Sequence, residues 1–155
     1  MSKAMIDLLE TRNVTLNDII DCVAYLEKGY NGGEIDHSLV GANILEILAK
    51  REVQHAIRTG IGLDRAAEEG LFEDKVLEDI IMRDESLYGV DEVLAYGICN
   101  LYGSIALTNF GYIDRVKPGI IGVLNEDKTG QCNTYLDDII GAIAASAASK
   151  SAHNR

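Results

Sequence analysis

Two pairs of adjacent acidic residues, Asp91-Glu92 and Asp137-Asp138, each open a long apolar stretch that predicts a helix. Between them lies the segment NFGYIDRVKP (109–118), which supplies a further acid and a lysine. Carboxylates from different helices provide the hard oxygen ligands that Mg²⁺ prefers, and water and a substrate phosphate commonly complete its shell. A nearby lysine can hold the phosphate as a point charge. These residue types therefore predict Mg²⁺-dependent phosphate chemistry.

A structural role also explains the acidic pairs, because acids in a first helical turn interact favourably with the helix dipole, typically by about 0.3–1 kcal/mol. One acid is enough for that purpose, however, and both helices carry two. The following turns are so apolar that the pairs should lie near the interior, where an unpartnered carboxylate is costly. Adjacent helical residues diverge by about 100°, so one acid of each pair would face the metal. A spare carboxylate could orient or deprotonate a bound water.

Lys117 precedes Pro118, the only proline of the chain. Because proline moves the preceding residue out of the helical region, Lys117 is expected on a rigid bend, directed at a phosphate. An ordinary surface lysine before a helix start is the alternative. Asp114, three residues earlier, would be a metal ligand or an ion-pair partner of Lys117 or Arg115.

The charge balance is strongly acidic, since 14 basic and 25 acidic residues give a formal net charge of −11. Such a chain should be repelled by nucleic acid and by anionic lipid, and its basic residues form no visible patch. The excess of carboxylates should instead attract divalent cations. The length of 155 residues and the 47% hydrophobic content predict one domain, spanning residues 1–155.

Three widely spaced cysteines, Cys22, Cys99 and Cys132, include no Cys-x-x-Cys pair. This set argues against a disulfide scaffold or a zinc ribbon and favours reduced thiols. The first residues carry an early acid and no apolar core, unlike a signal peptide. No run approaches the roughly 20 apolar residues that cross a bilayer. We therefore expect a cytoplasmic protein without a transmembrane segment.

Helical periodicity dominates the N-terminal half of the chain. The residues TLND at 15–18 predict a capped helix that stops near Gly29, before a loop at 31–33. Ser38 is a candidate cap for a second helix, whose apolar stripe continues to about Gly60. Shorter helices are expected over residues 63–69 and 72–82.

The stretch 90–108 is nearly all apolar after its opening acids, which predicts a buried central helix. Its glycines, Gly97 and Gly103, would let neighbouring helices approach closely. A last helix over 134–152 carries an alanine- and glycine-rich surface suited to tight packing and to a homo-oligomer interface. The one strand candidate, 119–124, is short and contains glycines. We therefore predict an all-α, single-domain bundle of about six helices around a buried central helix.

Three motifs occur in order along the C-terminal half: DESLYGVDE at 84–92, TNFGYIDRVKP at 108–118 and LDDIIG at 136–141. Together they resemble the phosphatidylglycerophosphatase A family. The family pattern has an Asp-Glu pair, a Phe-x-x-x-Asp-x-x-Lys-Pro segment, and an Asp-Asp pair with a glycine soon after. The segment KREVQHAIRTG at 50–60 resembles only the soluble, YutG-like branch of this family.

The resemblance implies an all-helical fold and Mg²⁺-dependent removal of the terminal phosphate from phosphatidylglycerophosphate, yielding phosphatidylglycerol. Two departures concern the lipid: the chain has no apolar span, and Gly111 follows Phe110 where membrane members have an arginine. A lipid substrate would require transient contact with the inner membrane surface. The implied site residues are Asp91, Glu92, Asp114, Lys117, Asp137 and Asp138, with Asp91, Glu92, Asp137 and Asp138 as the metal ligands.

Two other functions fit the same residues. A phosphatase acting on a soluble, non-lipid phosphomonoester would use the same chemistry. A non-catalytic, oligomeric helical module would keep the acids for folding or for a structural metal cluster. Glu52 and His55 share a helical face, as in di-metal Glu-x-x-His bundles, but no second copy of that motif occurs. An exposed or satisfied histidine is therefore the better interpretation of His55.

Overall fold

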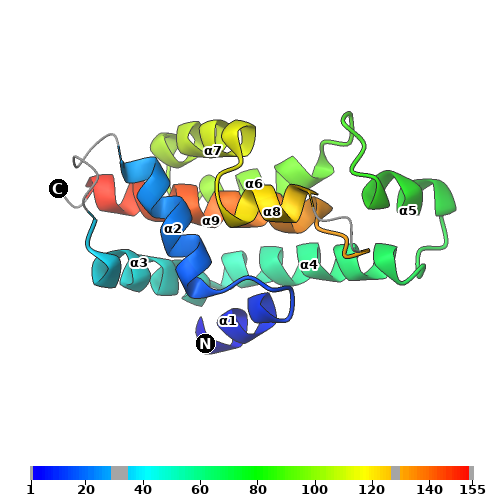
Figure 1. The fold of residues 1–155 in the computed structure, drawn as a ribbon, viewed down its shortest axis with the longest axis horizontal. Helices are drawn as coiled ribbons and strands as arrows, with labels where there is room; N and C mark the ends of the chain where they lie inside the picture. Colours follow the sequence, from blue (N-terminus) through cyan, green and yellow to red (C-terminus); the bar gives the residue numbers. More distant parts are fainter. Residues whose placement is uncertain (1, 29–34, 127–129, 154–155) are drawn as a thin grey trace.

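The computed structural model describes residues 2–28, 35–126 and 130–153, and these ranges contain helices and no strands, which confirms the predicted fold class (Figure 1). The predicted helix end near Gly29 and the loop at 31–33 lie outside the described residues. No helix in the described ranges is long and apolar enough to span a bilayer. Instead of about six helices, these ranges form nine: α1 (Ser2–Glu10), α2 (Leu16–Glu27), α3 (His37–Ala49), α4 (Arg51–Glu68), α5 (Lys75–Met82), α6 (Val90–Cys99), α7 (Ser104–Val116), α8 (Ile120–Glu126) and α9 (Thr134–His153).

The last helix, α9, is the centre of the bundle. Figure 1 shows α9 running through the middle of the molecule, with α7 on one side and α3 and α4 on the other. Helices α2, α6 and α8 also pack against it. Every residue from Thr134 to Ser149 is buried. The helix therefore needs no polar face, which explains its alanine-rich sequence.

The prediction of a single central helix over 90–108 is wrong. This stretch forms α6 and the start of α7, and the chain turns between them at Gly103, whose φ of +96° suits glycine. A Cβ at Gly97 or Gly103 would meet nothing within 4 Å, so neither glycine serves close packing. Val90 and Val93 are exposed, so α6 is not buried on all sides.

Small residues do allow close packing around α9. A Cβ on Gly141 would lie 3.5 Å from side-chain carbons of Phe110 and Ile113 on α7. A Cβ on Gly60, in α4, would lie 3.2 Å from the Cβ of Tyr135. The alanines of α9 from Ala142 to Ala148 are buried by other helices of the same chain. The predicted use of this surface as an interface between copies is therefore wrong.

The apolar stripe that was predicted as one helix to about Gly60 is divided between α3 and α4. Lys50 has an extended backbone (ψ 129°) and separates the two helices. Helix α4 then continues to Glu68, so the separate short helix predicted over 63–69 is mostly its last turns. Both helices pack against α9, and the apolar pattern does not reveal the break between them.

Side-chain caps mark several helix starts. Thr15 and Asp18 form a capping box at α2, as the sequence predicts. Asp36, rather than Ser38, caps α3 by accepting hydrogen bonds from the first free backbone N–H groups. Asp74 caps α5 in the same way, so this helix begins at Lys75 rather than at residue 72.

The turn between α7 and α8 determines the position of Lys117. Lys117 ends α7 in the left-handed conformation (φ +53°), and Gly119 repeats it (φ +56°). Pro118 thus moves the lysine out of the right-handed helical region, as predicted. Helix α8 follows directly, so the strand candidate at 119–124 is wrong. A Cβ on Gly122 would lie 2.6 Å from the Lys117 carbonyl oxygen, which makes this glycine necessary for the turn.

Candidate active site

The six predicted site residues come from the ends of three helices that pack together. Helices α6 and α7 contact each other, and both contact α9. Three of the carboxyl groups are almost completely buried, with exposed fractions of 4–5%. The site residues are Asp91 and Glu92 at the start of α6, Asp114 and Lys117 at the end of α7, and Asp137 and Asp138 near the start of α9.

Lys117 lies between acids of two helices. Its Nζ donates to Asp114 Oδ1 at 3.2 Å and lies 3.6 Å from Asp137 Oδ2. Burial alone would lower the pKa of Lys117, but the charges of Asp137, Asp114 and then Asp138 outweigh it and raise the pKa. The lysine is therefore firmly cationic and partly neutralises the acids around it.

Asp138 links the three helices through its carboxyl group. The carboxyl groups of Asp91 on α6 and Asp114 on α7 are its neighbours. Burial raises the pKa of Asp138, and the neighbouring charge of Asp137 raises it further. Two carboxyl groups share a hydrogen bond only when one carries a proton. Burial and the neighbouring carboxyl groups thus favour the protonated form of Asp138, and the positive charge of Lys117 offsets part of the negative charge of the cluster.

Asp137 and Glu92 also have raised pKa values. Burial raises the pKa of Asp137, and the positive charge of Lys117 opposes this shift. Burial also raises the pKa of Glu92, followed by the charges of Asp114 and Asp91. Asp91 Oδ1 accepts a hydrogen bond from the Glu92 backbone N–H at 3.0 Å. The division of work within each acidic pair, with one acid facing a metal, stays a prediction.

Two further residues belong to the same electrostatic environment and were not predicted. The charge of Asp84 raises the pKa values of Asp137 and Glu92. The hydroxyl of Tyr96 has a pKa raised by burial and then by Glu92 and Asp114, and its ring packs edge-on against Phe110 at 5.3 Å between centroids. Asp84 opens the first motif, and Tyr96 lies one helical turn after Glu92. The place of Asp84 in the motif and the spacing of Tyr96 from Glu92 are the sequence signals that could have identified these two residues.

The oxygen atoms of the site's carboxyl groups are of a type that binds divalent cations, but they are not arranged as a coordination shell. All are carboxylate oxygens, which suit Mg²⁺. In the part of the chain that the structure describes, no three Asp, Glu, His or Cys side chains surround a common point. Side-chain rotation, and loss of any proton that the carboxyl groups hold, would be needed to receive an ion.

An apolar pocket of about 400 Å³ lies between α4 and α6, apart from the acids. Val90, Val93, Leu94 and Gly97 form its α6 wall, and none of the six site residues lines it. His55 is exposed and lines the same pocket beside Glu52, without a metal-like cluster in the described residues. The pocket is therefore a feature separate from the acidic site.

Known proteins match this chain over nearly its whole length. YutG, an uncharacterized protein of Bacillus subtilis, is 51% identical over 146 residues, covering 94% of this chain and 86% of YutG. YpjQ of the same organism is 45% identical, covering 95% of this chain and 81% of YpjQ. A model of the phosphatidylglycerophosphatase A family matches residues 27–153.

Solved structures share the fold. A protein of unknown function from Bacillus stearothermophilus superposes with a TM-score of 0.93 at 49% identity, covering 99% of this chain and 94% of that one. The low temperature requirement C protein of Listeria monocytogenes superposes with a TM-score of 0.92 at 48% identity, covering 99% and 95%. The molecule is thus an all-helical protein with a buried acidic site assembled from three helices. This chain belongs to the phosphatidylglycerophosphatase A family, together with its relatives YutG and YpjQ.

Proposed function

We propose that this protein is a Mg²⁺-dependent phosphomonoesterase that removes the terminal phosphate of phosphatidylglycerophosphate and leaves phosphatidylglycerol. The observation that carries the proposal is the meeting of acids from α6, α7 and α9 around Asp138, with Lys117 beside them. Family membership supports a phosphorylated substrate. The oxygen-only set of donors supports Mg²⁺ rather than a softer metal.

The residues of the site suit hydrolysis of a phosphate ester. Bound Mg²⁺ would polarise a phosphoryl oxygen and lower the pKa of a coordinated water. Lys117, held at a rigid turn, would exchange its ion pairs with the acids for charge-assisted hydrogen bonds to the phosphate. A carboxylate of the Asp137-Asp138 pair would accept the proton of the attacking water, and burial raises the basicity of both. As the ester P–O bond breaks, that proton can pass to the departing alkoxide oxygen.

A soluble phosphomonoester is the second candidate substrate. The formal net charge of −11 opposes approach to an anionic membrane surface. The apolar pocket between α4 and α6 does not include the acids, so it gives no support to a lipid chain beside the phosphate. The phosphate chemistry at Lys117 and the acids is the same for both substrates.

The test is phosphate release from phosphatidylglycerophosphate in mixed micelles, with and without Mg²⁺, beside a panel of soluble phosphomonoesters. Asp138→Asn should abolish release because it removes the central carboxylate while keeping the shape of the side chain. Asp7→Asn is the matched control, since Asp7 pairs with Lys3 on the exposed surface of α1, far from the acidic site in the sequence. The control should retain full activity.

The substrate panel separates the candidates. Metal-dependent release from the lipid alone would support the lipid phosphatase, and a better soluble substrate would support the second candidate. No release from any substrate would contradict both. In that case the acids are a structural or cation-binding feature of a non-catalytic module.

A further inference from the structure

Asp64, in α4, binds the start of the central helix from outside that helix. Its carboxylate accepts the backbone N–H of Tyr135 at 3.0 Å on Oδ1 and 3.2 Å on Oδ2. Oδ2 also accepts the backbone N–H of Leu136 at 3.0 Å. Asp64 is completely buried. These two N–H groups belong to the first turn of α9 and have no partner within the helix.

The residue before α9 does not provide this cap. Asn133 is of a type that commonly caps helices, but its side chain is engaged elsewhere. Its Nδ2 donates to the Leu124 carbonyl at 3.1 Å, and its Oδ1 accepts from Gln131 Nε2 at 2.7 Å. Thr134 donates its hydroxyl to the Ile81 carbonyl. The first turn of α9 therefore depends on Asp64 for its free N–H groups.

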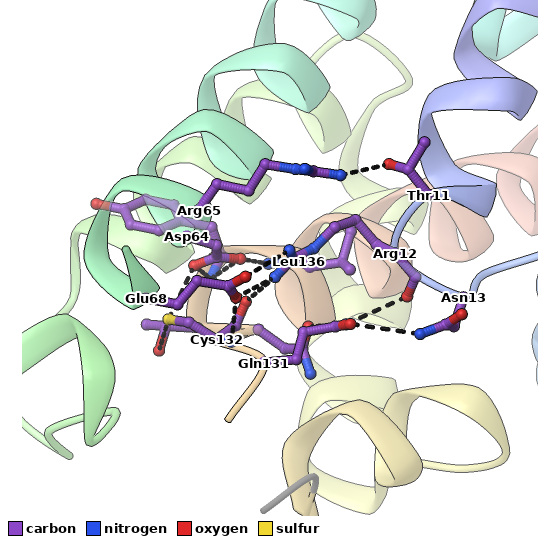
Figure 2. A network of polar contacts seen from close by, with 12 residues as sticks. Thr11, Arg12, Asn13, Asp64, Arg65, Glu68, Gln131, Cys132 and Leu136 are labelled. Carbon is purple, nitrogen blue, oxygen red and sulfur yellow. Dashed lines mark hydrogen bonds and ion pairs between the residues drawn. The ribbon is translucent and has the colours of Figure 1, made fainter. Parts of the chain in front are cut away.

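A wider network fixes Asp64 and the chain before α9 (Figure 2). Arg12, almost fully buried, donates to both carboxylate oxygens of Glu68, at 2.8 and 3.1 Å, and to the Cys132 carbonyl at 2.6 Å. Glu68 in turn accepts the Cys132 backbone N–H at 2.7 Å. One turn apart on α4, Asp64 and Glu68 thus hold consecutive parts of the chain that leads into α9.

Asp137 and Asp138 follow Leu136 directly, in the turn that Asp64 holds. Any rotation or fraying of this turn moves both carboxyl groups relative to Asp91 and Lys117. We propose that Asp64 is a positioning residue, which sets the orientation of the Asp137-Asp138 pair through the backbone N–H groups of Tyr135 and Leu136. The catalytic part of this inference rests on the proposed phosphatase function.

Stability alone does not account for this carboxylate. Burial raises the pKa of Asp64 to about 7, although the two backbone N–H groups oppose the shift. A buried group that resists ionisation is a poor source of stability near neutral pH, and a neutral amide could accept the same hydrogen bonds. What the acid supplies at this place is a fixed acceptor at the start of α9, next to the catalytic pair.

The experiment compares three variants. Asp64→Ala removes the acceptor. Asp64→Asn keeps an amide oxygen at the position of Oδ2, which accepts the backbone N–H groups of both Tyr135 and Leu136. Asn43→Ala is the matched control, because Asn43 is buried on α3 and donates to Ser151 Oγ at 3.2 Å, near the other end of α9. Each folded variant is measured for kcat and KM and for amide hydrogen exchange at Tyr135 and Leu136 by NMR.

We expect Asp64→Ala to lower kcat at least tenfold with KM changed less than threefold, and to speed exchange at Tyr135 and Leu136 at least tenfold. Asp64→Asn should restore both to within threefold of the unmodified protein, and Asn43→Ala should change neither. Unchanged exchange in Asp64→Ala would overturn the inference, as would Asn43→Ala lowering kcat equally. The exchange rates test whether Asp64 holds the first turn of α9, even if the unmodified protein has no phosphatase activity. Failure of the proposed function would appear instead as the absence of activity in the unmodified protein. If Asp64→Ala does not fold, impaired exchange protection and kcat in Asp64→Asn would equally overturn the inference.

Discussion

Lys117 Nζ lies 3.6 Å from Asp137 Oδ2, so a side chain at the end of α7 is paired with a buried acid of the central helix. The lysine also donates to Asp114 on its own helix, at 3.2 Å. This arrangement holds the ammonium group of Lys117 beside the acidic cluster. In the proposed reaction the same ammonium group binds the phosphate.

Lys117→Gln tests this relationship. The change should reduce kcat/KM at least 100-fold, because the phosphate loses a charged donor. It should also lower the free energy of unfolding by about 1–3 kcal/mol, since Asp137 is left without its partner. Lys150→Gln is the matched control: Lys150 pairs with exposed Glu46 at 2.8 Å, away from the site. Equal activity of both variants would contradict a role of Lys117 in phosphate binding.

Mg²⁺ should stabilise the folded protein measurably. A ligand that binds only the folded state adds about 2.7 kcal/mol at a concentration 100 times its Kd. Thermal unfolding should therefore shift to higher temperature with Mg²⁺, and Asp138→Asn should lose this shift. Without Mg²⁺, Asp138→Asn should be at least as stable as the unmodified protein, because burial and Asp137 already favour the protonated form of Asp138. A large loss of stability in this variant would instead indicate a structural acid.

The pH dependence of stability should reveal Asp64. Its pKa is raised from 3.8 to about 7 in the folded state, so the folded state binds more protons than the unfolded state between these values. The contribution of Asp64 to stability is thus greatest below about pH 4 and is lost as the pH rises through 7. Arg12, Cys132 and the two N–H groups of α9 surround this carboxyl group.

Asp64→Asn, which cannot ionise, isolates that effect. Its free energy of unfolding, measured with denaturant from pH 4 to 8, should exceed that of the unmodified protein increasingly toward pH 7–8, by about 4 kcal/mol at most for a shift of this size. As the pH falls toward 4, the two curves should converge. Parallel curves over the whole range would show that Asp64 has an ordinary pKa.

The sequence was most informative where a local pattern has a local consequence. The capping box of Thr15, the bend at Lys117 before Pro118 and the start of α9 at Thr134 were each predictable from neighbouring residues. The three motifs also placed the acids on helix ends, and the structure brings those ends together. Which acids contact each other depends on the packing of α6 and α7 on α9, which no local pattern specifies.

The errors have a common physical cause, which is that apolar content does not tell which neighbours surround a helix. Residues 90–108 are apolar although α6 exposes Val90 and Val93, whereas α9 is apolar because it is enclosed. Asp64 was missed for a related reason. A carboxylate that caps a helix 71 residues away leaves no periodic trace in the sequence.

Gly60 should be essential for the packing of α4 on α9, although glycine is unfavourable inside a helix. Gly60→Ala places a methyl group 3.2 Å from Tyr135 Cβ and against the end of the Ile139 side chain. Overpacking of this kind typically costs about 1–3 kcal/mol. The shift would also displace the first turn of α9, so activity should fall together with stability.

Gly62→Ala is the control on the same helix, because a Cβ there meets nothing within 4 Å. That change should stabilise the protein by about 0.4–1 kcal/mol through the gain in helix propensity and the stiffer unfolded chain. Denaturant unfolding of the two variants measures the difference directly, and a stabilising Gly60→Ala would show that α4 and α9 do not approach as closely as described.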